Sequence, residues 1–165
     1  MEGLVVKGLP YILGDDVDTD VIIPAVYLGL KDIKEISRHV LEPIDPDFPA
    51  KASRGVVIIA GRNFGMGSSR EQAVTALKAA GVKGVVAESF ARIFYRNAVN
   101  NALPVAECKD ATHRIRGNEP VILDLDKGIL TQGDTIIQCR IPTGIALDII
   151  RSNGLLELLK SRLAK

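Results

Sequence analysis

The sequence predicts an α/β domain with a parallel sheet. Between residues 55 and 107, three apolar runs typical of buried strands alternate with two segments of helical periodicity. We expect the strands at 56–60, 84–88 and 103–107 and the helices at 69–80 and 90–101. Such alternation is typical of parallel strands joined by helices. The chain has 165 residues, so we expect a single domain over 1–165.

Shorter elements are expected before this core. Residues 4–12 and 21–23 are β-rich runs separated by an acidic turn, and a mobile loop follows at 27–31. A short helix is predicted from Ile33 to Leu41 because Ile33, Ile36, Val40 and Leu41 fall on one helical face. The stretch 42–49 holds three prolines and three acids, which predicts a surface connection.

The elements after the core are a β-rich tail and a helical end. Short β runs with Asp-Lys-Gly and Gln-Gly-Asp turns cover 113–141. A helical region is predicted over 144–163, with a break near Asn153-Gly154.

Composition limits the class of protein. Apolar residues make up 47% and charged residues 25%, as in soluble globular proteins, and the net charge is +1. This balance does not favour nucleic acid or a membrane surface as a partner. No apolar run approaches the ~18 residues of a membrane span, and the start lacks a signal-peptide pattern. We therefore expect a cytoplasmic protein.

The two cysteines, Cys108 and Cys139, lie far apart and neither is part of a CxxC motif. We expect them to be buried as small apolar residues rather than to bind metal. The sequence therefore predicts no metal site on this chain.

The segment from Gly61 to Arg70, here called the glycine turn, is the strongest functional signal. Its three glycines let the backbone turn sharply and bring N–H groups toward a ligand. Ser68 or Ser69 is expected to cap the following helix, with Glu71 or Gln72 completing a capping box. Two hydroxyls and the Arg70 guanidinium at a helix start suit a carboxylate or phosphate.

Two familiar glycine motifs do not fit the turn. A P-loop has Lys and then Ser or Thr after its last glycine, whereas Ser68 directly follows Gly67. The dinucleotide fingerprint needs glycine where Arg70 stands. A tight connection with a good helix cap and no ligand is the structural alternative.

The acidic segment Asp15–Asp20 has three interpretations. Its four aspartates resemble a calcium loop only loosely, because the glycine and the bidentate glutamate of such loops are missing. A polar turn is the second interpretation. The third is that Asp18 or Asp20 orients Arg70 through a charge-assisted pair.

Four motifs in order give the chain a family resemblance. They are Asp16–Pro24, Gly61–Ala73, Ala87–Ala98 and Asn101–Pro104. Together they resemble the signature of the swivelling domain of the aconitase superfamily. Within it they are most similar to the family of separate small subunits of 3-isopropylmalate dehydratases. The match covers about residues 8–107 and continues more weakly through the tail.

The resemblance implies a three-layer β/β/α swivelling domain that forms half of a hydro-lyase. The other half is a large subunit that holds a [4Fe-4S] cluster on its own cysteines, so no cofactor is expected on this chain. The implied reaction dehydrates a 2-hydroxy dicarboxylate and rehydrates it at the neighbouring carbon, in leucine biosynthesis. One iron acts as a Lewis acid on the leaving hydroxyl. The free small subunit is compatible with a homo-oligomer.

By the family's pattern Ser68 is the base that removes a proton beside a carboxylate. Backbone N–H groups at the helix start and the charge of Arg70 would stabilise its alkoxide. Arg70 would also bind a substrate carboxylate through both nitrogens. Ser69 would donate a further hydrogen bond or cap the helix. Supporting roles fall to Asn63, Gly65, Gly67, Asp18 and Asp20, and more weakly to Arg62.

Substrate choice is expected to depend on a loop. In related small subunits the loop after the Asp-Thr-Asp strand reaches the variable part of the substrate; here it contains Leu28, Gly29, Leu30 and Lys31. Homoaconitate-type relatives tend to carry an arginine there, so Gly29 and Leu30 better suit an isopropyl group. Lys31 could replace that arginine, which keeps a homoaconitase or citraconate hydratase-type subunit open. An anion-binding module without a catalytic partner is the non-enzyme alternative.

The remaining motif residues are expected to be structural. Phe90, Ile93 and Phe94 have core spacing, and Arg92 or Arg96 is expected to face the partner or an acid of this domain. Gln72 departs from the histidine of many relatives. His39 and His113 are expected on the surface.

Overall fold

A seven-stranded sheet forms the centre of the computed structural model, which describes residues 3–164. The strand order is β4-β3-β2-β1-β5-β6-β7. The strands are β1 (Val5–Ile12), β2 (Val56–Ala60), β3 (Val82–Ala87), β4 (Val105–Glu107), β5 (Val121–Asp124), β6 (Ile129–Gln132) and β7 (Thr135–Gln138).

The sheet has a parallel half and an antiparallel half that share β1. β1, β2, β3 and β4 run parallel, with Leu9 opposite Val56 and Val85 opposite Val105. β5 pairs antiparallel with the start of β1, and β5, β6 and β7 form a meander. β2 is buried along its whole length, as expected for a central parallel strand covered on both faces.

The two edges of this curled sheet meet. Glu107 at the end of β4 and Arg140 after β7 exchange two backbone hydrogen bonds, of 2.8 and 2.7 Å. Their neighbours Cys108 and Cys139 form a disulfide with Cα atoms 4.4 Å apart. Cys108 is buried as expected and Cys139 is partly buried, but their bond was not predicted, because only the curl brings residues 31 positions apart in sequence onto facing strand ends.

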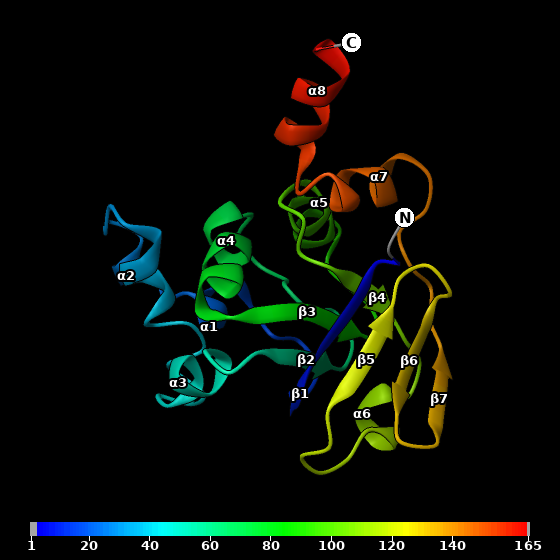
Figure 1. Ribbon diagram of the computed structural model, residues 1–165. Helices are drawn as coiled ribbons and strands as arrows, with labels where there is room; N and C mark the ends of the chain where they lie inside the picture. Colours follow the sequence, from blue (N-terminus) through cyan, green and yellow to red (C-terminus); the bar gives the residue numbers. More distant parts are fainter. Residues whose placement is uncertain (1–2, 165) are drawn as a thin grey trace.

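Helices cover the parallel half. Figure 1 shows α4 and α5 beside β3, the antiparallel strands on the opposite side, and α8 extending away from the rest. The helices are α1 (Thr19–Ile22), α2 (Ile33–Ser37), α3 (Phe48–Ala52), α4 (Glu71–Ala80), α5 (Arg92–Asn100), α6 (Ala111–Arg114), α7 (Ile145–Arg151) and α8 (Leu155–Leu163). A 3₁₀ turn, η1, spans Ala25–Tyr27.

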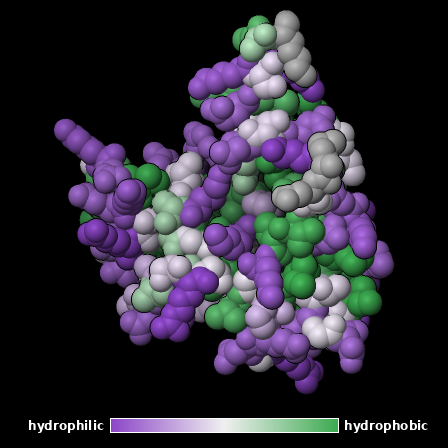
Figure 2. Space-filling view, viewed as in Figure 1, coloured by the Kyte–Doolittle hydropathy of each residue, from purple (hydrophilic) through white to green (hydrophobic). Residues whose placement is uncertain are grey.

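One hydrophobic cluster joins the two halves, and it includes residues from β2, β3, α4, β5 and β6. Polar side chains cover much of the surface in Figure 2, with an apolar area over β1 and β5. Val5 of β1 and Ile122 of β5 are both exposed. Within residues 3–164, no helix is long and apolar enough to cross a membrane.

Several predicted boundaries need correction. Residues 21–23 lie at the end of α1 rather than in a strand, because Asp18 accepts a hydrogen bond from the Asp20 N–H and starts a helical turn. The predicted surface connection at 42–49 runs into α3, and α2 ends at Ser37 instead of Leu41. The break near Asn153-Gly154 is confirmed between α7 and α8.

Candidate active site

The glycine turn leaves the carboxyl end of β2 and enters α4. Loops that follow parallel strands in an α/β sheet meet at one edge, where ligands commonly bind. The segments after β1 and β3, Leu13–Asp18 and Glu88–Ala91, flank the turn on its two sides. Gly65 and Gly67 have φ angles of 84° and 93°, a region that favours glycine. A Cβ at Gly65 would overlap the Phe94 ring, and one at Gly67 would lie 2.7 Å from the Asp18 carboxylate.

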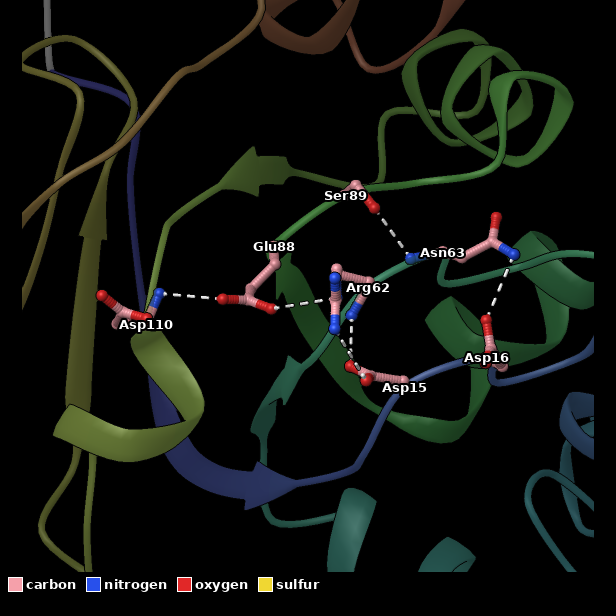
Figure 3. Close-up of polar contacts among 7 residues, drawn as sticks. All are labelled: Asp15, Asp16, Arg62, Asn63, Glu88, Ser89 and Asp110. Carbon is pink, nitrogen blue, oxygen red and sulfur yellow. Dashed lines mark hydrogen bonds and ion pairs between the residues drawn. The ribbon is translucent and has the colours of Figure 1, made fainter.

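The acidic segment holds the start of the turn (Figure 3). The Asp15 carboxylate accepts a 2.7 Å hydrogen bond from the Arg62 backbone N–H, and the Asp16 N–H donates to the Arg62 carbonyl at 2.8 Å. The Asn63 side-chain amide donates to Asp16 at 3.2 Å. The Arg62 guanidinium is mostly exposed and lies 3.9 Å from Asp15 and 4.0 Å from Glu88. Arg62 and Asn63 thus support the start of the turn.

The segment after β3 holds the other side of the turn. The Asn63 N–H donates to the Ser89 hydroxyl at 2.8 Å, and the Phe64 N–H donates to the Ser89 carbonyl at 3.0 Å. The Ala91 N–H then donates to the Phe64 carbonyl at 2.9 Å. The first half of the turn is therefore fixed between two loops.

Arg70 is oriented by groups of α1 and the residue after it. Its guanidinium lies 2.5 Å from the Asp20 carboxylate and donates to the Ile23 carbonyl at 3.1 Å. The arginine side chain is 16% exposed, so it is largely desolvated. Of the two acids expected to pair with Arg70, Asp20 forms the pair and Asp18 caps α1. Among the described residues, no group of three or more His, Cys, Asp or Glu could hold a metal ion.

Ser68 and Ser69 are exposed, and their side chains form no hydrogen bond within residues 3–164. The expectation that one of them caps the helix was wrong. α4 begins at Glu71, and Arg70 occupies the N-cap position without a side-chain bond to the N–H groups of the helix. Both hydroxyls are consequently available to a ligand.

A cleft of about 200 Å³ lies in front of these hydroxyls, between the glycine turn and the start of α5. Ser68, Ser69 and Arg70 line one side, and Arg92, Ile93 and Asn97 line the other. Its charged residues are two arginines and no carboxylate, which favours an anion. Arg92 has no ion-pair partner within the described part of the chain.

The residues that line the α5 side of the cleft were not all predicted from the sequence. Ile93 was expected in the core, yet it is 49% exposed, because the buried face of α5 consists of Phe94, Ala98 and Val99. Thr19 and Asn97 were not expected in the cleft at all, although both line it. Their places depend on the approach of α1 and α5 to the turn, which no local motif signals.

The loop residues Leu28, Gly29, Leu30 and Lys31 do not line this cleft. The loop begins at η1, where the Tyr27 ring stacks on His39 with centroids 3.7 Å apart. His39 Nδ1 lies 2.9 Å from Glu42, and a hydrogen bond from Tyr27 lowers the pKa of Glu42. His39 is therefore half-buried against the loop rather than a free surface residue.

A larger cleft of about 480 Å³ lies elsewhere, beside β1 and α3. Its Tyr11 hydroxyl donates to Asp45 at 2.7 Å, and Lys51 donates to the same oxygen at 2.8 Å. Burial and the bond to Asp45 raise the pKa of Tyr11 to about 12. Because this cleft contains no residue of the glycine turn, we place the candidate site at the smaller cleft.

Comparisons with known proteins decide the family. Residues 29–109 match the aconitase C-terminal domain. The chain is 52% identical over 157 residues, 95% of each chain, to a 3-isopropylmalate dehydratase small subunit of Saccharolobus islandicus. It is also 50% identical to the 3-isopropylmalate dehydratase small subunit of Metallosphaera sedula. This match covers 95% of this chain and 98% of the Metallosphaera sedula protein. The chain belongs to the family of 3-isopropylmalate dehydratase small subunits.

A solved structure of this family has the same fold. The crystal structure of 3-isopropylmalate dehydratase (LeuD) from Methanocaldococcus jannaschii matches with a TM-score of 0.91 and 44% identity. The match covers 98% of this chain and 96% of that one. The predicted fold class, an α/β domain of the aconitase C-terminal type, is confirmed.

Proposed function

We propose that this protein is the small subunit of a 3-isopropylmalate dehydratase. It would isomerise 2- and 3-isopropylmalate by dehydration and rehydration, in leucine biosynthesis and with a large subunit. The observation that carries the proposal is the pair of free hydroxyls, Ser68 and Ser69, beside a cationic cleft in a member of this family.

Ser68 would act as the general base. An ordinary serine hydroxyl is too weak an acid to ionise near neutral pH, so its alkoxide needs stabilisation. The start of α4 offers backbone N–H groups, and Arg70 supplies a fixed positive charge held by Asp20. The alkoxide would take the proton from the carbon beside a substrate carboxylate.

The substrate is a small dicarboxylate, and the cleft offers two guanidinium groups for it. Arg70 would bind one carboxylate through both nitrogens, while Arg92 faces the same space and is free to bind the other. Ser69 would donate a further hydrogen bond. The exposed Ile93 offers an apolar contact to the isopropyl group.

The loop Leu28–Lys31 would provide the second contact to the variable part of the substrate. The loop comes shortly after Ile23, whose carbonyl accepts a hydrogen bond from Arg70. It would therefore start near the place where Arg70 binds the substrate carboxylate. Leu28, Gly29 and Leu30 suit an isopropyl group, whereas Lys31 would suit the third carboxylate of a homoaconitate-type substrate.

The iron–sulfur cluster of such enzymes would belong to the large subunit. This chain does not fit a cluster, because Cys108 and Cys139 are bonded to each other. Within the described residues they are the chain's two cysteines. Ser68 and Arg70 would therefore face the cluster across the subunit interface.

The decisive experiment reconstitutes the chain anaerobically with its cognate large subunit. We expect a kcat/KM for isopropylmalate that greatly exceeds that for homoaconitate-type or citraconate-type substrates, and no turnover by the isolated chain. Preference for the tricarboxylate would assign a homoaconitase subunit and a binding role to Lys31. Absence of turnover with all of these substrates would leave an anion-binding module.

Replacing Ser68 by alanine tests the base. We expect S68A to lower kcat by about 10²- to 10⁴-fold, the contribution usual for a general base, with assembly unchanged. S161A removes an exposed hydroxyl on α8 and serves as the control. A near-normal kcat in S68A would remove Ser68 from the base role.

A further inference from the structure

Thr19, the first residue of α1, has an unusually buried side chain for its type. Thr19 is 2% exposed. Among the described residues, the buried polar residues are Thr19, Ser37 and Gln132. A buried hydroxyl is normally hydrogen-bonded, so its partner indicates its role. The partner here is the carbonyl oxygen of Ser68, at 2.9 Å.

Thr19 bonds the glycine turn at two points. Besides the hydroxyl bond to Ser68, its backbone N–H donates to the Met66 carbonyl at 2.9 Å. These two acceptors lie on either side of Gly67, whose Cα faces the Asp18 carboxylate. Asp18 and Thr19 therefore fix the backbone from Met66 to Ser68.

Asp20 and Ile23 hold the Arg70 side chain, but Ser68 itself depends on Thr19. Residues 61–65 bond to the loops on both sides, but Ser68 has no hydrogen bond within residues 3–164 besides that from Thr19. The place of the Ser68 Cβ follows from the conformation of its own backbone. The Thr19 hydroxyl thus helps to fix the point from which the Ser68 oxygen reaches into the cleft.

We propose that Thr19 is a positioning residue for Ser68: it holds the backbone of Ser68 at the place from which the serine oxygen reaches the proton to be transferred. This inference rests on the proposed role of Ser68 as base. Displacement of a reacting atom by about 1 Å costs on the order of a hundredfold in rate. The same bond polarises the peptide that follows Ser68 and makes its N–H a better donor to a nearby alkoxide.

The test compares T19V, which removes the hydroxyl at equal volume, with T19S, which keeps it. In the assembled complex we expect T19V to lower kcat by about tenfold to a hundredfold, with KM changed less than threefold. The acid limb of its kcat–pH profile should move to higher pH, because the alkoxide is less stabilised. T19S should restore kcat to within about threefold of the wild type. T75V is the matched control: Thr75 also bonds a backbone carbonyl, at 3.4 Å, but lies inside α4.

A second readout does not depend on substrate. In the free subunit, amide hydrogen exchange at position 19, whose N–H donates to the Met66 carbonyl, should speed up in T19V and stay unchanged in T75V. Unchanged exchange in T19V, or unchanged kcat in an active complex, would overturn the inference. Failure of both T19V and T19A to fold or assemble would overturn it as well, since Thr19 would then be structural. An inactive wild-type complex would instead refute the proposed function, and the exchange experiment would still decide whether Thr19 orders the turn.

Discussion

At the scale of single residues, the four aspartates of the acidic segment each have a different task. Asp15 and Asp16 bond the start of the glycine turn, Asp18 caps α1 beside Gly67, and Asp20 pairs with Arg70. A charge-assisted pair of Arg70 with Asp18 or Asp20 was one of the three interpretations that the sequence left open, and the structure shows the pair with Asp20. The choice between Asp18 and Asp20 depends on α1, whose second half was predicted as part of a β-rich run at 21–23.

Replacing Asp20 by asparagine tests this pair. Since the Arg70 side chain is only 16% exposed, loss of its charged partner should leave the guanidinium less well oriented. We expect D20N to raise KM for the dicarboxylate about tenfold or more, measured by steady-state kinetics of the complex. E157Q removes an exposed acid 3.5 Å from Lys160 and should have no effect. An unchanged KM in D20N would mean that Arg70 does not need this partner.

At the scale of elements, the strand-helix pattern from β2 to β4 was predicted well and the segments around the cleft were not. A fully apolar run such as 56–60 has few alternatives to a central strand, so local pattern and burial agree. Val21 and Ile22 instead belong to a one-turn helix, because the Asp18 cap outweighs their β propensity. Likewise Ile93 has core spacing yet lines the cleft, since periodicity does not indicate which side of a helix start faces a neighbour.

The glycine turn tolerates no side chain at Gly67. A Cβ there would lie 2.7 Å from the Asp18 carboxylate, at a φ of 93°. We expect G67A to destabilise the chain by about 1–3 kcal/mol in urea unfolding and to lower kcat of the complex. The control is G117A, where φ is also positive but the Cβ meets open space. If the two variants lost the same stability, backbone strain alone would account for the effect of G67A, and the contact with Asp18 would not contribute.

The contact of α3 with β1 makes stability depend on pH. Hydrogen bonds from Lys51 and Tyr11 lower the pKa of Asp45 below its usual 3.8. A carboxyl with a lowered pKa stabilises the folded state above its unfolded pKa, and this contribution is lost as pH falls through the folded pKa. We expect D45N to be less stable than the wild type at pH 7, with the difference shrinking toward pH 3, by urea unfolding. D134N changes an exposed turn residue and should show no such trend; a constant difference in D45N would contradict the proposed linkage.

At the scale of the whole molecule, the disulfide joins the two edges of the sheet. Sequence could not predict it, because Cys108 and Cys139 are brought together only by the curl of all seven strands. Cross-linking positions 31 residues apart should contribute about 3–4 kcal/mol by restricting the unfolded chain. We expect the C108S/C139S double variant to lose stability of this order in urea unfolding without reductant. With reductant, the wild type should approach the variant; equal stability of oxidised wild type and variant would contradict this expectation.

The meeting of β4 with the end of β7 has a consequence for the chain before it finds its partner. An exposed strand edge is a template on which other chains can add and aggregate. Here the Glu107–Arg140 bonds and the disulfide occupy the end of that edge, and α6 follows β4 directly. At the joined ends of β4 and β7, the backbone groups of Glu107 and Arg140 are thus already paired and cannot receive a strand of another chain.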